Sequence, residues 1–148
     1  MPREPVTALT GGCQCGAVRF RAGDFGRSAI CHCRMCQKAF GGFFGPLVTV
    51  GELAWTRGAP KFFRSSNIAR RGFCGDCGTP LCYVQDGGPF EMAIGAFDDP
   101  NDVAPAVQFN LRDRLAFFDA LSSLPPQPHH DKELEYNSRV SSHQHPDR

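Results

Sequence analysis

The amino-acid sequence predicts a mainly β fold of antiparallel strands in a single domain. Its middle part contains several short runs rich in aromatic and β-branched residues, separated by Gly, Pro, Asn and Asp. A chain of 148 residues is long enough to bury about 68–70% of its unfolded surface, so one hydrophobic core is sufficient. The chain also has eight cysteines, most of them in close groups, which indicates that bound metal ions cross-link and stabilise the fold.

The first predicted strand is the segment AVRFRA, residues 17–22. In this segment Val18 and Phe20 alternate with Arg19 and Arg21, which is the period of a half-buried strand. The same composition predicts further strands at residues 43–50, 53–56, 61–66, 81–85, 91–97 and 106–111.

One short helix is predicted among these strands. The segment RMCQKAF, which starts at Arg34, contains no Gly or Pro, and Gly41 and Gly42 end it after about two turns. Residues 112–124 are ambiguous, because their apolar residues have helical spacing but a strand and loop over the core would use the same aromatic side chains.

The composition changes after Pro125. We therefore divide the chain into an N-terminal extension (residues 1–9), a zinc-binding domain (10–125) and a polar C-terminal tail (126–148), which we expect to be mobile. Four of the five histidines lie in this tail. We interpret them as solvated side chains, since no local cysteine accompanies them as a metal ligand.

Charge and hydropathy exclude several classes of partner. The formal net charge is +1, with 41% hydrophobic and 21% charged residues, so the sequence predicts no nucleic-acid partner. It predicts no membrane segment either, because no apolar run approaches the ~20 residues that span a bilayer. The N-terminus lacks the apolar region of a secretory signal, and we expect a cytoplasmic protein. In that reducing compartment, clustered cysteines favour metal binding over disulfides.

Two cysteine pairs have the spacing of chelating units. Cys13 and Cys15 form a C-x-C pair, whose side chains project to one face of an extended segment, and Cys74 and Cys77 form a C-x2-C pair around a tight turn. Together the pairs predict a closed four-cysteine zinc site. Such a site suits a structural role, because no coordination position remains for a substrate.

Three further cysteines, Cys31, Cys33 and Cys36, predict a second zinc with one open position, as in catalytic sites. Three thiolates leave a formal charge of −1 on the site, whereas four leave −2, so the second site is better suited to receive an anionic ligand such as a substrate thiolate. Cys82 is an alternative fourth ligand, but we favour a buried apolar role for it.

A histidine and an arginine pair near the cysteines are further candidate site residues. His32 lies between two of the predicted ligands and is expected to point away from the metal, in a structural or supporting role. Arg70 and Arg71 precede the second cysteine pair and are suited to bind substrate carboxylates, although paired arginines are also typical of a solvated surface.

The ordered series GGCQCGAVRF, CHCRMCQKAFGG, LAWTRG, RRGFCGDCGTPL and AIGAFDDP resembles the glutathione-dependent formaldehyde-activating enzyme family, which includes relatives of centromere protein V. The resemblance covers about residues 10–125. It implies a β-tent fold of antiparallel sheets, with structural zinc at Cys13, Cys15, Cys74 and Cys77 and catalytic zinc at Cys31, Cys33 and Cys36. The activity that it implies is condensation of formaldehyde with glutathione to S-hydroxymethylglutathione, a reaction of the carbon–sulfur lyase class.

The combined prediction is a zinc-dependent, carbon–sulfur lyase-like enzyme with two zinc ions per chain. Its expected partner is a small thiol such as glutathione, taken together with an aldehyde as the thiol adduct. The alternative is a non-catalytic, zinc-stabilised module that binds another protein. The sequence makes no prediction of the oligomeric state.

Overall fold

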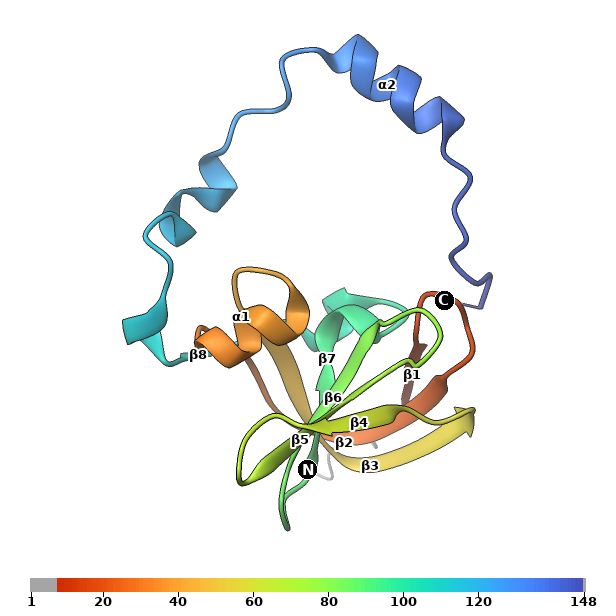
Figure 1. The fold of residues 1–148 in the computed structure, drawn as a ribbon, viewed down its shortest axis with the longest axis vertical. Coiled ribbons are helices and arrows are strands. Elements are labelled where there is room, and N and C mark those ends of the chain that lie inside the picture. Colours follow the sequence, from red (N-terminus) through yellow and green to blue (C-terminus); the bar gives the residue numbers. More distant parts are fainter. Residues whose placement is uncertain (1–7, 148) are drawn as a thin grey trace, which may run out of the picture.

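The fold is built around one β-sheet that curves over a hydrophobic core, with a long segment that leaves the sheet and returns to it (Figure 1). The computed structural model describes residues 8–147. Within that range the strands are β1 (Leu9–Gly12), β2 (Arg19–Cys31), β3 (Gly45–Arg57), β4 (Lys61–Arg64), β5 (Ala69–Phe73), β6 (Pro80–Gln85), β7 (Phe90–Ala93) and β8 (Val107–Phe109). The helices are α1 (Arg34–Phe40), α2 (His130–Arg139) and the 3-10 helices η1 (Ile94–Ala96), η2 (Pro100–Val103), η3 (Leu111–Asp113) and η4 (Phe118–Ser123).

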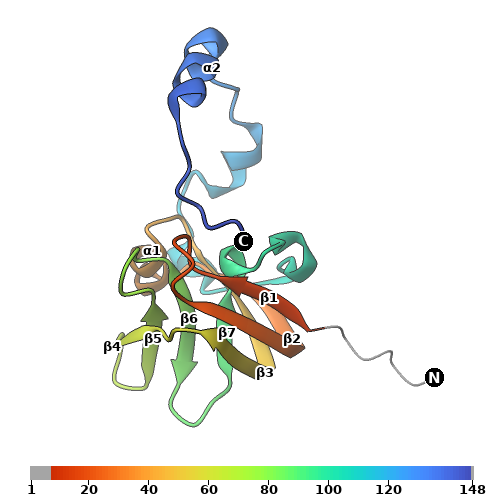
Figure 2. The ribbon, with the colours of Figure 1, turned by 90° about the vertical axis from the view of Figure 1, so that its right-hand side faces the viewer.

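The strand order in the sheet is β1-β2-β3-β7-β6-β5-β4, and neighbouring strands in this order are antiparallel. Figure 2 shows β1, β2 and β3 on one side of β7, with β6, β5 and β4 on the other. β8 pairs in parallel with the end of β2, at residues 29–31. The pairing of β3 with β7 therefore joins both halves into one continuous sheet.

A β-bulge bends the two longest strands. The register between β2 and β3 shifts between Phe25 and Ser28, and Asp24 has a positive φ of 52°. This break lets the first half of β2 lie over the core while its last residue, Cys31, reaches the start of α1.

The structure confirms the predicted mainly β, antiparallel fold, but several elements differ from the prediction. Residues 94–96, predicted as part of a strand at 91–97, form η1, and β2 extends to Cys31, beyond the predicted segment 17–22. The predicted strands at residues 43–50 and 53–56 are parts of the single strand β3, and β8 is parallel to its partner. β1 and β5 were not predicted, because their sequences LTGG and ARRGF contain glycine and charged residues that are depleted in strands.

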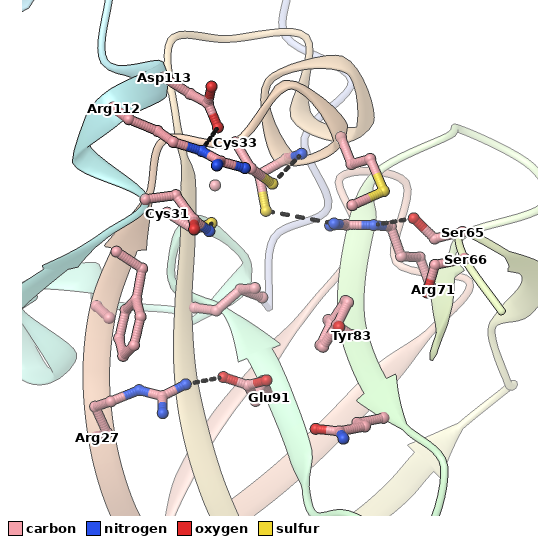
Figure 3. Close-up of a pocket in the computed structure, with 18 residues that line it drawn as sticks. Arg27, Cys31, Cys33, Ser65, Ser66, Arg71, Tyr83, Glu91, Arg112 and Asp113 are labelled. Carbon is pink, nitrogen blue, oxygen red and sulfur yellow. Dashed lines mark hydrogen bonds and ion pairs between the residues drawn. The ribbon is translucent and has the colours of Figure 1, made fainter. Parts of the chain in front are cut away.

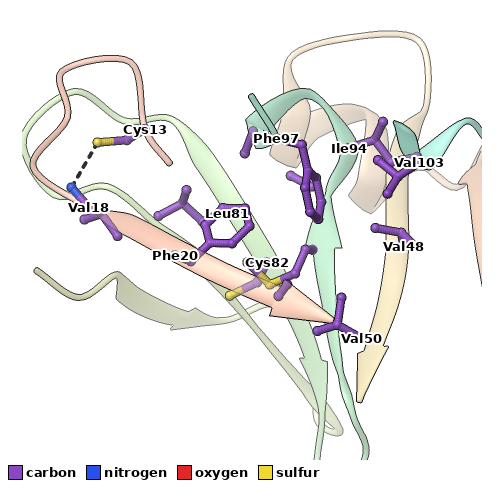
Figure 4. Close-up of a cluster of buried hydrophobic side chains, with 14 of the residues drawn as sticks. Cys13, Val18, Phe20, Val48, Val50, Leu81, Cys82, Ile94, Phe97 and Val103 are labelled. Carbon is purple, nitrogen blue, oxygen red and sulfur yellow. Dashed lines mark hydrogen bonds between the residues drawn. The ribbon is translucent and has the colours of Figure 1, made fainter. Parts of the chain in front are cut away.

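The core lies on the concave side of the sheet (Figure 4). Phe20, Leu81 and Met92 are each 0% exposed. The ring of Phe20 meets that of Phe97 edge to face, with the centroids 5.2 Å apart, which is a favourable aromatic geometry. Cys82 belongs to the same buried cluster, as the apolar interpretation of this residue predicted.

The helix predicted to start at Arg34 is confirmed as α1. It ends at Gly41, whose φ of 60° is readily adopted only by glycine and whose N–H faces the carbonyl groups of Gln37 and Lys38. Residues 112–124 form no α-helix but contain part of η3 and all of η4.

The chain leaves the sheet after β8 and passes through α2, none of whose residues is buried. It then returns to the turn between β1 and β2, where the His145 amide donates to the Gln14 carbonyl at 2.9 Å and Asp147 pairs with Arg57 at 3.2 Å. The mobility of residues 126–148 and the domain limit at residue 125 stay predictions. No helix in residues 8–147 has the length and apolar character needed to cross a membrane.

A partly buried ion pair fixes the first strands to the segment after β7. Asp98 accepts hydrogen bonds from two nitrogens of Arg19, each at 2.8 Å, with side chains 25% and 11% exposed. These bonds lower the pKa of Asp98, so the pair stabilises the fold above the unfolded-state pKa of about 3.9, and the effect is lost as the pH falls through the folded-state value.

We expect Asp98→Asn to lower the free energy of unfolding at pH 7 by about 2 kcal/mol, because it removes a hydrogen-bonded charge. The difference from wild type should shrink below pH 4 or so, as measured by urea unfolding of zinc-loaded protein at several pH values. Asp86→Asn is the matched control, since Asp86 pairs with Arg64 in the same two-bond manner while both side chains are more than 50% exposed. It should cost clearly less than Asp98→Asn, because solvent screens an exposed pair, and equal losses in the two variants would contradict the assigned role of burial.

Candidate metal centres and the adjoining pocket

Four cysteines from two distant turns meet at one point. Cys13 and Cys15 lie between β1 and β2, and Cys74 and Cys77 lie between β5 and β6. Their four sulfur atoms all lie within 4.8 Å of one another. The Sγ atoms of Cys13 and Cys15 are 3.6 Å apart and those of Cys15 and Cys74 are 3.8 Å apart, and none forms a disulfide.

These separations fit a tetrahedral metal site. Four sulfurs at about 2.3 Å from a zinc ion lie about 3.8 Å from one another. Backbone amides also face the sulfurs, since the Val18 N–H donates to Cys13 Sγ at 3.2 Å and the Asp76 N–H faces Cys74 Sγ at 3.4 Å. Such donors stabilise thiolates without occupying a coordination position.

The second cluster lies at the junction of β2 and α1. Cys31 ends β2, Cys33 is the N-cap of α1 and Cys36 lies in the first turn of that helix. The three sulfurs lie within 4.8 Å of one another. The thiol of Cys33 accepts from the Cys36 amide at 3.4 Å, so the helix start itself holds two of the sulfurs in place.

A pocket of about 380 Å³ opens directly beside this second cluster (Figure 3). Its walls come from β2, β3, β5, β6 and β7 and from residues 109–113, and all three clustered cysteines line it. A volume above about 300 Å³ is in the range of small-molecule sites. The four-cysteine cluster contributes nothing to its lining.

Arg71 connects the pocket to the second cluster. It is 5% exposed. Its Nη2 donates to Cys36 Sγ at 3.3 Å and its Nε to Ser65 Oγ at 2.8 Å, while its guanidinium lies 4.9 Å from the ring centroid of Tyr83. Burial raises the pKa of the Cys36 thiol to about 12, and the contact with Arg71 opposes this increase. Arg71 is therefore placed to stabilise sulfur in its anionic form.

A polar row crosses the floor of the pocket. Arg71 on β5 lies opposite Tyr83 on β6, and Tyr83 lies opposite Glu91 on β7, so the three side chains share one face of the sheet. Glu91 pairs with Arg27 at 2.7 Å, and Arg27 stacks over the ring of Phe109 at 4.3 Å. The charge of Glu91 is therefore already balanced within the pocket.

Asn110 completes the rim of the second cluster. Its Nδ2 donates to Cys31 Sγ at 3.2 Å, and its backbone has a φ of 56°, a conformation that asparagine tolerates better than most residues. Partial burial acts to raise the pKa of the Cys31 thiol, but hydrogen bonds from the Cys33 backbone and from Asn110 lower it overall. Sulfur at this position is thus kept closer to its metal-binding, deprotonated form.

His32 and Cys82 both lie away from the sulfur clusters. The His32 ring is 0% exposed, its Nε2 contacts Gln108 Oε1 at 2.9 Å, and its Nδ1 has no partner among the described residues. Cys82 lies in the core on β6 and does not join the group of Cys31, Cys33 and Cys36. His32 thus packs behind the second cluster, as expected of a supporting residue.

The tertiary structure separates the two arginines that the sequence presents as a pair. Arg70 is exposed and stacks over Phe62 at 4.3 Å, whereas Arg71 is buried beside Cys36. Asn110, Tyr83 and Ser65 were not predicted as site residues, because each lies far along the chain from Cys31, Cys33 and Cys36. An asparagine near the end of the strand predicted at residues 106–111 was the one available signal, since asparagine tolerates positive φ.

The donor chemistry fits zinc at both clusters. Sets of four and of three thiolates are typical of zinc sites, and both groups of sulfurs are compact enough to share one ion. The two clusters could therefore each hold a metal ion. The first would be closed, and the second would keep a position that faces the pocket.

Comparison with known proteins gives a consistent result. Residues 8–113 match the family model described as glutathione-dependent formaldehyde-activating enzyme. A crystal structure of a protein from Rhodobacter sphaeroides is similar, with a TM-score of 0.52 and 19% sequence identity over 68% of this chain and 99% of that chain. At this identity the similarity supports the fold alone. No curated protein matches the chain.

Proposed function

The chain belongs to the glutathione-dependent formaldehyde-activating enzyme family, and we propose that it is a zinc-dependent carbon–sulfur lyase acting on the adduct of a small thiol with an aldehyde. The observation that carries this proposal is the pocket, because three clustered cysteines line it while the four-cysteine cluster does not. Glutathione and formaldehyde are the first substrates to test, as the family description suggests.

The proposal assigns the two clusters different roles. Cys13, Cys15, Cys74 and Cys77 would hold a structural zinc, and Cys31, Cys33 and Cys36 would hold a catalytic zinc. A zinc ion with an open position lowers the pKa of a thiol that binds there and fixes its orientation. Two zinc ions per chain follow from this assignment.

The reaction forms one carbon–sulfur bond. The thiol gives up its S–H proton, its sulfur forms the bond to the aldehyde carbon, and the carbonyl π electrons move to oxygen. That oxygen takes up one proton, which balances the proton lost from sulfur and gives the S-hydroxyalkyl adduct. Pocket side chains suit these changes: Arg71 is a fixed cation beside the sulfurs. Tyr83 keeps its proton, because burial raises its pKa, and can donate a hydrogen bond to the carbonyl oxygen.

The pocket walls supply orientation. Leu47 and Met35 add apolar side chains to the pocket lining, and Ser65 and Ser66 add hydroxyl groups. Holding a thiol and an aldehyde together in this space would convert a bimolecular encounter into an oriented one.

We expect zinc-loaded protein to accelerate exchange between free formaldehyde and S-hydroxymethylglutathione, in proportion to enzyme concentration and above the spontaneous rate. The measurement is magnetisation exchange by NMR with ¹³C-formaldehyde, together with elemental analysis that should give two zinc ions per chain. A panel of other small thiols identifies the preferred substrate. No acceleration with any thiol, in protein that holds both zinc ions, would contradict the lyase proposal.

The alternative function is a non-catalytic, zinc-stabilised module that binds another protein. One observation favours it: the segment after β8 exposes large apolar side chains, which is typical of interaction surfaces. These are Leu111, Phe117, Leu124, Leu134, Tyr136 and Val140. This alternative predicts that loss of the second zinc leaves the protein's function unchanged, whereas the lyase proposal predicts loss of activity.

A further inference from the structure

We propose that Arg71 is a positioning residue that sets the charge of the three-cysteine site, so that the site selects an anionic sulfur ligand over a neutral one. The inference rests on the proposed function only in taking Cys31, Cys33 and Cys36 as a zinc site with an open position. It concerns which ligand that position accepts, and it holds whether or not the bound thiol then reacts.

The first argument is the lack of any other counterion for Arg71. In residues 8–147 its guanidinium forms no ion pair with a carboxylate; its partners are a hydroxyl, a sulfur and an aromatic ring. A buried charge without a counterion is costly. The sulfur of Cys36 at 3.3 Å, which is a thiolate when it binds zinc, is therefore the counterion available to this buried cation.

The second argument is the charge of the site. Three thiolates on a divalent zinc ion carry a formal charge of −1, and the adjacent Arg71 brings the assembly to zero. An anionic fourth ligand then changes the net charge of the assembly from zero to −1. Without Arg71 the same ligand would bring the charge to −2 in a partly buried pocket. Arg71 thus favours a thiolate specifically, because a neutral ligand changes no charge.

The third argument is the contrast with the four-cysteine cluster. There the groups from outside the cluster that contact its sulfurs, in the described part of the chain, are backbone amides and the Thr79 hydroxyl, all uncharged. At the three-cysteine cluster a guanidinium and the Asn110 side-chain amide face the sulfurs. Among residues 8–147, a charged side chain donates a hydrogen bond to a sulfur only at the cluster that lines the pocket.

The position of Arg71 is itself fixed by its neighbours. Ser65 Oγ accepts from Nε at 2.8 Å, and Tyr83 stacks against the guanidinium. This arrangement orients Nη2 toward the sulfur, as Figure 3 shows. Lysine at this position would keep the charge but would lose the planar contacts to Ser65 and Tyr83.

The test is a binding titration that requires no catalysis. Protein with Co²⁺ in the three-cysteine site is titrated with 2-mercaptoethanol, which binds as a thiolate, and with neutral imidazole, and the visible spectrum of the cobalt reports each ligand. We expect Arg71→Gln to weaken 2-mercaptoethanol binding by about 10-fold to 100-fold and to leave imidazole binding within about twofold. Arg71→Lys should restore part of the lost thiol affinity, because it restores the charge.

Two further variants make the result decisive. Arg70→Gln is the matched control, since Arg70 is exposed over Phe62 and should affect neither ligand. Ser65→Ala keeps Arg71 but removes the hydrogen bond to its Nε, and should weaken 2-mercaptoethanol binding less than Arg71→Gln does. This variant tests the inference even if Arg71→Gln fails to fold. Equal loss of both ligands in Arg71→Gln, or no loss of thiol binding in Ser65→Ala and Arg71→Gln, would overturn the inference.

The inference and the proposed function fail in different ways. If wild-type protein binds 2-mercaptoethanol in an Arg71-dependent manner but accelerates no thiol–aldehyde exchange, the lyase proposal is wrong and the role of Arg71 stands. If exchange is accelerated but Arg71→Gln changes 2-mercaptoethanol and imidazole binding equally, the lyase proposal stands and the role of Arg71 is wrong.

Discussion

Cys74→Ser is expected to remove one zinc ion per chain and abolish the cooperative unfolding transition of the protein. Cys74 is buried and its sulfur lies 3.8 Å from that of Cys15, so it closes the contact between the β1–β2 and β5–β6 turns. Structural zinc contributes about 10–16 kcal/mol in small zinc-binding domains. A domain of this size has a total stability of about 5–15 kcal/mol, so loss of the metal removes the whole margin.

The measurement is zinc content by elemental analysis, combined with thermal unfolding followed by circular dichroism. Cys82→Ala is the matched control, because Cys82 is an equally buried cysteine in the same core that belongs to neither cluster. It should keep two zinc ions and lose only about 1 kcal/mol of stability. A Cys74→Ser protein with two zinc ions and an unchanged transition would refute the structural-zinc assignment.

Cys33→Ser is expected to remove only the second zinc ion and to lower the rate of thiol–aldehyde exchange by at least about 100-fold. Cys33 is the N-cap of α1, where its sulfur accepts from the Cys36 amide. Serine is among the best N-cap residues, so the substitution keeps the helix start while it removes a thiolate ligand. Changes to residues that merely support a metal ligand already cost about 10–100-fold, and loss of a ligand should cost more.

Activity, zinc content and thermal stability are measured on the same preparation. We expect one zinc ion per chain and a melting temperature close to that of wild type, because the four-cysteine cluster is untouched. Met35→Ala serves as a control for the pocket, since Met35 lines it without offering a metal ligand of the cluster. Full activity in Cys33→Ser with one zinc ion bound would contradict the assignment of a catalytic zinc to the second cluster.

The two variants also separate the roles of the clusters. A structural site affects stability first and activity as a consequence, whereas a catalytic site affects activity with little change in stability. The pocket gives the physical basis for this difference, because it exposes the sulfurs of the second cluster and none of the first.

Local features of the fold were predictable from the sequence because they depend on short-range chemistry. The alternation of Val18 and Phe20 with arginines places Phe20 in the core, and the two glycines after Phe40 end α1. Strands β1 and β5 were not predicted, because LTGG and ARRGF show no alternation of apolar and polar residues, and their pairing with β2 and with β4 and β6 involves residues distant in the chain.

Cysteine spacing alone gave the composition of both clusters, since C-x-C and C-x2-C pairs are chelating units in themselves. That Cys13 and Cys15 meet Cys74 and Cys77 is a consequence of the fold, but it was foreseeable because a four-ligand site needs two such pairs. The pairing of Cys13 and Cys15 with Cys74 and Cys77 thus follows from the four ligands that a closed zinc site needs, and it requires no knowledge of strand order.

The pocket, by contrast, was decided only by the tertiary structure. Arg70 and Arg71 are equivalent in the sequence, and the register of β5 with β6 places Arg71 opposite Tyr83 and beside Cys36 while Arg70 remains exposed. Asn110 reaches Cys31 because β8 pairs with the end of β2. Strand register and crossover pairing arise from long-range contacts, and a shift of one residue would exchange the two faces of a strand, so no local pattern could assign these residues to the site.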